Sequence, residues 1–147
     1  MKIYQAQPQD VDKILPLFLA YRDFYNVESN KEEVFLYLLN RVKLGESVIF
    51  FIEENNEVVG FTQLYPLFCS LEMKRIWLLY DLFVKKEYRK KGIAKALIQR
   101  AEKLGEESNS AFIMLSTGID NFKAQSLYEQ NGFVRDNDFY VYNKCIL

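Results

Sequence analysis

The sequence of 147 residues contains no histidine. A Ser-His-Asp or Cys-His nucleophile, a histidine-ligated metal and a histidine general base are therefore excluded. Any catalysis has to use carboxylates, tyrosines, lysines, backbone dipoles or water. Only two cysteines are present, Cys69 and Cys145, and they are far apart in the sequence. They indicate neither a disulfide framework nor a zinc site, so we expect no metal and a reducing, cytoplasmic environment.

Long apolar runs and a strong net charge are also missing. No stretch approaches the roughly 18 apolar residues of a membrane span, and the N-terminus lacks the apolar core of a signal peptide. The formal net charge of −1 argues against nucleic-acid binding by general phosphate attraction. We therefore expect neither a membrane nor a nucleic acid as a partner. Half of the residues are hydrophobic, enough for a single folded domain over residues 1–147.

The changes between helical and strand periodicity predict an α/β fold of mixed order, β-α-α-β-β-β-α-β-α-β-β. Hairpins combined with one strand-helix-strand crossover indicate a mixed, mostly antiparallel sheet flanked by about four helices. A capping-box pattern, Ser29 followed by Glu32, starts the second helix, and Asn131-Gly132 predicts a left-handed cap after the last one. In chain order the elements are a strand at 2–6, a helix opened by Pro8 and Asp10, a helix at 29–43, strands at 48–52, 58–67 and 75–84, a helix at 92–106, a strand at 112–115, a helix at 121–130, and strands at 133–134 and 139–146.

A basic turn joins the strand that ends at Val84 to the helix that begins at Gly92. Six basic residues and one acidic residue lie between Lys85 and Lys95, which gives a local charge of +5. The free N–H groups and the dipole of a helix N-terminus attract anions, and the small Gly92 and Ala94 would let a diphosphate approach the backbone. The alternative is an ordinary solvated, lysine-rich turn. The pattern is not GxxxxGKS, so we expect no nucleotide P-loop.

Two motifs resemble the acetyl-CoA signatures of the GNAT superfamily of N-acetyltransferases. Arg89-x-x-Gly92-x-Ala94, after the strand Leu82-Phe83-Val84, is similar to the first signature. The second is similar to Asn121-x-x-Ala124-x-x-Leu127-Tyr128-x-x-Asn131-Gly132-Phe133. The interval between the motifs and the order of elements are also similar, so the resemblance covers nearly the whole chain. It implies a GNAT-like sheet with a splayed strand pair, and acetyl transfer from acetyl-CoA to a primary amine by direct attack on the thioester, in a ternary complex without a covalent intermediate.

The resemblance also implies where acetyl-CoA binds. The pantetheine arm would lie between the strand that includes Leu82, Phe83 and Val84 and the next strand, at 112–116, with backbone contacts to Leu82 and Val84. Asn121 would bond the pantetheine or a nearby backbone group. The diphosphate would contact the turn, near the Arg89 side chain and on the backbone amides of Lys90, Lys91, Gly92, Ile93, Ala94 and Lys95.

Tyr128 matches the tyrosine that donates a proton to the leaving thiolate. Tyrosine titrates near pH 10 and a thiol near about 8.5, so a neutral tyrosine hydroxyl can stabilise the charge that develops on sulfur. The alternative is that Tyr128 is only a core aromatic residue beside Leu127.

Asp81 is the candidate general base. It lies among apolar neighbours in the strand at 75–84, and activation of the amine would explain a carboxylate there. A structural hydrogen bond is the competing explanation. On the later strand, Ser116 and Thr117 stand where some relatives carry Glu, which argues against a base at that position.

Three segments rich in aromatic residues are expected to bind the acceptor, a small-molecule or peptide amine. They are residues 18–25, 66–75 and 136–142. Aromatic rings with a few carboxylates suit a cationic amine. They suit a plain core or a dimer interface equally well, which leaves a homodimer open. The alternative function is a catalytically idle acyl-CoA-binding or regulatory module on the same fold.

Overall fold

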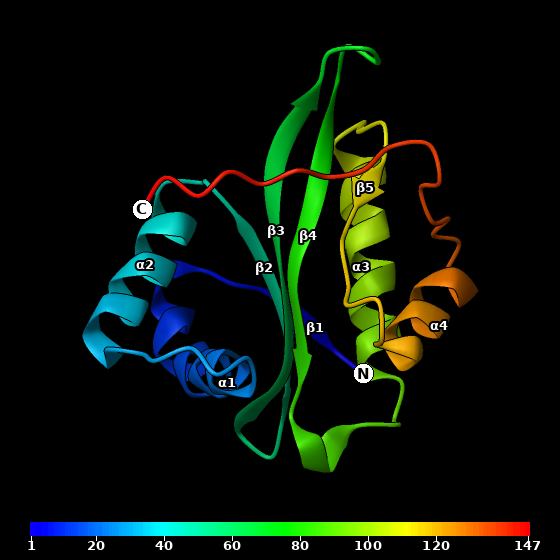
Figure 1. Cartoon of the computed structure of the whole chain (residues 1–147). Helices are drawn as coiled ribbons and strands as arrows, with labels where there is room; N and C mark the ends of the chain where they lie inside the picture. Colours follow the sequence, from blue (N-terminus) through cyan, green and yellow to red (C-terminus); the bar gives the residue numbers. More distant parts are fainter. The chain divides into compact units, whose positions relative to one another are not determined.

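The computed structural model describes residues 1–147, which form two compact units, residues 1–116 and 117–147. The first unit is built around a five-stranded sheet with the strand order β1-β2-β3-β4-β5 (Figure 1). Neighbouring strands are antiparallel except β4 and β5, which are parallel. The predicted mixed, mostly antiparallel sheet is thereby confirmed. The strands are β1 (Ile3–Gln5), β2 (Val48–Glu54), β3 (Glu57–Cys69), β4 (Lys74–Val84) and β5 (Ile113–Met114).

Helices cover both faces of this sheet (Figure 1). Successive strand residues point to opposite faces, so Phe51 enters the core under α1 and α2 while Phe50 enters the core under α3. Each helix presents apolar residues at helical spacing to its core. The helices of this unit are α1 (Val11–Phe24), α2 (Lys31–Lys43) and α3 (Ile93–Glu107), and short 3-10 turns precede α1 (η1, Pro8–Asp10) and α3 (η2, Lys86–Tyr88).

The start of α2 differs from the prediction by one residue. Its N-cap is Asn30, whose side chain accepts a hydrogen bond from the Glu33 N–H at 3.1 Å. The predicted capping box of Ser29 and Glu32 is therefore wrong. Asn caps a helix as well as Ser does, so the two registers differ little in energy and the sequence alone does not separate them.

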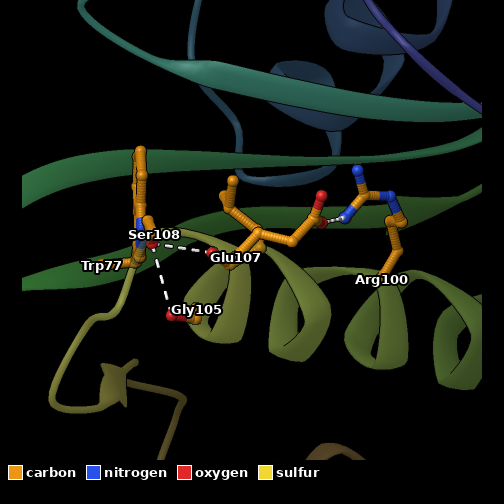
Figure 2. Close-up of polar contacts among 6 residues, drawn as sticks. Trp77, Arg100, Gly105, Glu107 and Ser108 are labelled. Carbon is orange, nitrogen blue, oxygen red and sulfur yellow. Dashed lines mark hydrogen bonds and ion pairs between the residues drawn. The ribbon is translucent and has the colours of Figure 1, made fainter.

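Both ends of α3 are fixed to the sheet. At its C-terminal end, the Trp77 indole of β4 donates a hydrogen bond to Ser108 Oγ at 2.9 Å, and that hydroxyl contacts the Leu104 carbonyl at 2.7 Å (Figure 2). At its N-terminal end, a Cβ added at Gly60 of β3 would lie 2.6 Å from Ile93 Cγ2. A larger residue at position 60 would therefore push α3 away from β3.

A β-bulge interrupts the pairing of β4 with β3. Asp81 is opposite Gln63 and Leu79 is opposite Leu64, which leaves Tyr80 without a partner. The extra residue changes which face the following side chains occupy. Leu79 packs in the core under α3, whereas Asp81 bonds to α1 on the opposite face. Regular alternation would have placed Asp81 on the same face as Leu79.

The second unit contains α4 (Phe122–Gln130). The Asn121 side chain caps this helix by accepting a hydrogen bond from the Ala124 N–H at 3.2 Å. The left-handed cap predicted at its end is confirmed at Gly132, with φ of +87°. The two strands predicted after α4, at 133–134 and 139–146, are wrong, because no strand forms there. The segment has the composition of a strand. A strand also needs a hydrogen-bonded neighbour, and composition does not supply one.

Candidate active site

The parallel strands β4 and β5 separate after a short contact. Their pairing consists of Trp77 with Ile113 and Leu78 with Met114. β4 then continues to Val84 without a partner on this side. The splayed strand pair that the sequence resemblance implied is therefore present. An unpaired strand backbone offers N–H and C=O groups that can bind an extended ligand as an added strand would.

Leu82 and Val84 direct their backbone groups into the gap. The Lys85 N–H bonds to Val59 of β3 at 2.8 Å, and backbone groups alternate along a strand, so Val84 and Leu82 face away from β3. Phe83 differs from them, because its backbone alternates toward β3 and its ring packs on the α1 face.

The N-terminus of α3 follows β4 and the short turn η2, and it has no side-chain cap. Its N-cap is Gly92, in the left-handed region with φ of +81°, and Lys90 is also left-handed with φ of +64°. A Cβ added at Gly92 would meet no atom within 4 Å, so the space in front of the helix is open. Successive backbone N–H groups in such a turn form a concave anion site.

Charges around this turn are mostly uncompensated. Lys85 forms an ion pair with Glu57 at 2.7 Å, which raises the pKa of the lysine and lowers that of the glutamate. No carboxylate lies within ion-pair distance of Lys90, Lys91 or Lys95, and all three are exposed. The turn thus keeps most of the positive charge that its sequence indicated.

Arg89 is held in place by three contacts. Its Nε donates to the Val84 carbonyl at 2.9 Å, and its guanidinium lies over the rings of Phe24 and Phe83, 5.9 and 5.3 Å from their centroids. An exposed arginine fixed in this way is preorganised and loses little side-chain entropy on binding an anion.

Asp81 is 4% exposed, and both of its carboxylate oxygens accept hydrogen bonds. The Tyr21 hydroxyl of α1 donates to Oδ1 at 2.6 Å, and Gln63 Nε2 donates to Oδ2 at 2.9 Å. Gln63 Oε1 accepts from Ser47 Oγ at 2.7 Å, and Thr62 Oγ1 donates to the Asp81 carbonyl at 2.8 Å. Tyr21 is partly exposed and the other four residues are buried, so Tyr21 connects this network to solvent.

Burial raises the pKa of Asp81, and the hydrogen bonds from Tyr21 and Gln63 offset only part of this rise. Burial also raises the pKa of Tyr21, as does its hydrogen bond to the negative Asp81. The tyrosine therefore remains a proton donor at neutral pH. A carboxylate whose pKa is moved toward neutrality is a better general base than an ordinary one.

Aromatic side chains surround Tyr21 on the α1 face. Its ring contacts those of Phe61, Phe83 and Tyr25, with centroid distances between 5.4 and 5.7 Å. Tyr25 is more than half exposed, so part of this cluster is open to an incoming molecule.

In the second unit, α4 carries Asn121, Gln125 and Tyr128 at positions i, i+4 and i+7. Asn121 bonds to a backbone N–H of its own helix, and Gln125 Nε2 donates to the Gly118 carbonyl at 2.9 Å. The Tyr128 ring packs against Phe133 with a centroid distance of 5.8 Å. These contacts stabilise α4, which forms most of the second sequence motif.

No group of three or more His, Cys, Asp or Glu side chains is placed to hold a metal ion. None of the helices combines the length and the apolar character needed to cross a membrane.

A mixed sheet whose parallel strands separate beside a basic, uncapped helix start defines the GNAT class of acyltransferases. The chain belongs to the acetyltransferase (GNAT) family, whose model matches residues 14–133. It is 44% identical over 142 residues to the uncharacterized N-acetyltransferase YhfO of Bacillus subtilis (strain 168), covering 97% of this chain and 95% of YhfO. A probable acetyltransferase of Haemophilus influenzae is 32% identical over 134 residues, 90% of each chain.

Solved structures agree with this assignment. The crystal structure of a probable acetyltransferase superimposes with a TM-score of 0.94 at 38% identity, over 100% of this chain and 99% of that one. The protein is thus an acetyltransferase of the GNAT family, as the two sequence motifs indicated.

The sequence predicted Asp81 as a site residue but missed the residues that hold it. Tyr21 stood in an aromatic segment that was assigned to acceptor binding, and Gln63 lies inside a mostly apolar strand. A polar residue inside a buried strand is a signal that could have identified Gln63, because such a residue needs a partner.

Tyr21→Phe tests the Asp81 network through stability. The substitution removes a hydrogen bond to a buried carboxylate, so we expect the free energy of unfolding to fall by about 2 kcal/mol near pH 8. Burial raises the folded-state pKa of Asp81 above its unfolded value. Ionisation of Asp81 therefore costs stability as the pH rises from the unfolded pKa through the folded pKa. The Tyr21 hydroxyl reduces that cost.

Below the unfolded pKa, near pH 4 or lower, the carboxyl is neutral and the loss should shrink to about 1 kcal/mol. Urea unfolding at both pH values measures the difference. Tyr25→Phe, at an exposed tyrosine with ring contacts, is the matched control and should change stability at neither pH. An equal loss for Tyr21→Phe at both pH values would contradict the network.

Proposed function

We propose that the protein transfers the acetyl group of acetyl-CoA to the primary amine of a small molecule or peptide. The amine attacks the thioester directly in a ternary complex, and no covalent enzyme intermediate forms. The observation that carries this proposal is the uncapped N-terminus of α3, which has an open space before Gly92 and follows a strand with an unpaired edge. Such a site accepts a diphosphate joined to an extended arm.

The residues that would hold acetyl-CoA lie along β4 and the turn. Leu82 and Val84 offer backbone groups to the pantetheine arm, and the helix start from Lys90 to Lys95 offers N–H groups to the diphosphate. Arg89 adds a fixed positive charge. By the family signature, Asn121 would bond the pantetheine or a nearby backbone group.

Asp81 accepts the amine proton through Tyr21. The Tyr21 oxygen accepts a proton from the ammonium group while its own proton passes to Asp81 Oδ1, and the free amine then attacks. This route fits a carboxylate that is 4% exposed and already bonded to the Tyr21 hydroxyl at 2.6 Å. An amine with a pKa near 10.4 costs roughly 4.6 kcal/mol to deprotonate at neutral pH, so assistance matters.

Tyr128 donates a proton to the leaving sulfur. The assignment rests on the family signature that runs from Asn121 to Phe133, with Tyr128 on a capped helix. Release of free thiol from acetyl-CoA with a panel of amines tests the function as a whole. Binding of CoA without thiol release for any amine would favour the idle acyl-CoA-binding module.

Gly92→Val tests the diphosphate site. The side chain would occupy the open space in front of α3, so we expect CoA affinity to fall at least about tenfold. Gly45→Val is the matched control, because Gly45 is also left-handed, with φ of +66°, and also has no atom near its Cβ position. Both variants should lose about 1–2 kcal/mol of stability, and only Gly92→Val should lose CoA affinity. Calorimetric titration of CoA at low and high salt measures this, and unchanged affinity in folded Gly92→Val protein would contradict the site.

Asp81→Asn separates catalysis from folding. The new amide can donate to Gln63 once the Gln63 amide turns over, and Ser47 can then accept from Gln63, so we expect a folded protein. CoA affinity should stay near normal while kcat near pH 7 falls at least about tenfold. The loss should shrink as the pH rises and free amine accumulates. A turnover defect that is constant across pH, or a protein that unfolds, would assign Asp81 a structural role instead.

Tyr128→Phe removes one hydroxyl and keeps the ring, so the contact with Phe133 should persist. Positioned acid catalysis typically contributes about 10²- to 10⁴-fold, and we expect kcat to fall at least about tenfold with little change in CoA affinity or thermal stability. Steady-state acetyl transfer with a confirmed acceptor measures this. Tyr4→Phe, on β1 at the far edge of the sheet, is the control. Full activity in Tyr128→Phe protein would show that solvent or another group protonates the sulfur.

A further inference from the structure

A buried side-chain amide contacts the inner oxygen of Asp81. Gln63 is 0% exposed and Ser47 is 6% exposed. Gln63 Nε2 donates to Asp81 Oδ2 at 2.9 Å, and Ser47 Oγ donates to Gln63 Oε1 at 2.7 Å. The other carboxylate oxygen, Oδ1, accepts from the Tyr21 hydroxyl at 2.6 Å. The two oxygens of Asp81 therefore have different partners, an amide on one side and a tyrosine on the other.

The chemistry of these groups fixes the orientation of the Gln63 amide. An ionised carboxylate only accepts hydrogen bonds, so Gln63 has to present its nitrogen to Asp81. The oxygen of the same amide then meets Ser47, whose hydroxyl has to donate. If the amide turned over, Ser47 would accept from Nε2, and its own proton would lack an acceptor, because the structure gives Ser47 Oγ no other partner. A buried donor without an acceptor is costly, so Ser47 favours the observed orientation.

Ser47 is held in turn by the segment that follows α2. The Arg41 carbonyl accepts hydrogen bonds from the N–H groups of Glu46 and Ser47, at 2.8 and 3.3 Å. The Arg41 side chain also forms an ion pair with Glu46 at 2.8 Å. The Ser47 hydroxyl therefore belongs to a segment with defined backbone and side-chain contacts.

We propose that Ser47 is a positioning residue, which acts through the Gln63 amide to keep the acidic proton of Asp81 on Oδ1, the oxygen that faces Tyr21. The inference rests on the proposed role of Asp81 as the base. While Nε2 donates to Oδ2, only Oδ1 is available for the proton that the Tyr21 hydroxyl releases, and the Tyr21 oxygen receives the proton of the ammonium group. A turned amide would present Oε1 to Oδ2 and stabilise a proton there, away from Tyr21.

No basic side chain forms an ion pair with Asp81. The titratable and charged groups around it are tyrosines and one arginine. They are Tyr21 and Tyr25 at the end of α1, Tyr37 and Arg41 on α2, Tyr65 on β3 and Tyr80 on β4. Burial raises the pKa values of Tyr21 and Tyr65, so both stay neutral while Asp81 titrates. Burial and hydrogen bonds therefore govern the titration of Asp81.

Titration of the Asp81 carboxyl tests the inference without an activity assay. Its ¹³C NMR signal is identified by its absence from Asp81→Asn protein. Ser47→Ala removes the donor to Gln63 Oε1, so the observed amide orientation loses its advantage and Nε2 becomes a weaker donor. We expect the pKa of Asp81 to rise by about half a unit to one unit, which corresponds to one ordinary hydrogen bond.

Two further variants show whether the effect passes through Gln63. Gln63→Met keeps the length of the side chain without its donor and should raise the pKa of Asp81 by about one to two units. Ser47→Ala should add no further rise in the Gln63→Met background. Thr62→Val is the matched control, because it also removes a buried hydroxyl that bonds to Asp81, but at the backbone carbonyl. It should leave the pKa of the Asp81 carboxyl unchanged.

Three results of this titration would overturn the proposal. They are an unchanged carboxyl pKa in Ser47→Ala protein, an equal rise in Thr62→Val protein, and a further rise when Ser47→Ala is added to Gln63→Met.

The pH dependence of kcat/KM, measured with a confirmed acceptor, separates this inference from the proposed function. If Asp81 is the base, the acid limb of the profile should move to higher pH together with the carboxyl pKa in Ser47→Ala protein. A carboxyl pKa that rises while the profile stays in place would uphold the positioning by Ser47 and contradict Asp81 as the base.

The unmodified protein supplies a measurement that needs no variant to fold. NOE contacts should connect the Gln63 amide protons to Asp81 both above and below the carboxyl pKa, because Oδ2 accepts from Nε2 in both protonation states. Amide protons that move from Asp81 to Ser47 as the carboxyl becomes protonated would show that the proton resides on Oδ2, and would overturn the proposal.

Discussion

The single unpaired residue in β4, Tyr80, sets the chemistry of the surrounding strand. Without it, the alternation that places Leu79 under α3 would place Asp81 there too, inside an apolar core with no donor. With it, Asp81 reaches the Tyr21 hydroxyl and Gln63, while Leu82 and Val84 return to the α3 face and direct their backbone groups to the gap beside β5. The cost of the irregular pairing is limited, because the Thr62 hydroxyl bonds to the Asp81 carbonyl at the bulge. One extra residue thus serves both the carboxylate and the strand edge.

α3 differs from α2 and α4 in how its N-terminus is capped. Asn30 and Asn121 satisfy N–H groups of α2 and α4 with their own side chains. At α3 the corresponding position is Gly92, which has no side chain to offer, and the preceding residues are basic. Free N–H groups at a helix start are costly when they are buried without a partner, and the space in front of Gly92 is open, so water or an anion can satisfy them. α3 therefore begins without a side-chain cap, and the anion site proposed there would use the N–H groups that a cap would otherwise satisfy.

Most of the fold could be predicted from the sequence, and the reasons for the exceptions are physical. Elements up to Gln130 lie close to their predicted positions, because the hydrophobic period changes clearly at Ser47 and Gly92. The two motifs also placed the basic turn and Tyr128 on the correct elements. The bulge could not be predicted, since the strand from Ile76 to Val84 is apolar on both faces except at Asp81. Its sequence therefore has no alternation of polar and apolar residues that a bulge would visibly interrupt. The strand at 139–146 was predicted from its composition. Composition shows that a segment favours the strand conformation, but it does not show whether a neighbouring strand is available to pair with it.

The separation of β4 and β5 forfeits ladder hydrogen bonds, so other contacts must hold the two strands. The Ala111 N–H bonds to the Arg75 carbonyl and the Trp77 N–H to the Phe112 carbonyl, which fixes the narrow end of the gap. α3 supports β4 along its length. Its C-terminal end is tied at the narrow end of the gap, where Ser108 accepts a hydrogen bond from Trp77, and its N-terminal end packs on Gly60 of β3 without space for a methyl group. Because this helix packs on the sheet at both of its ends, its uncapped N-terminus keeps a fixed relation to the gap between β4 and β5.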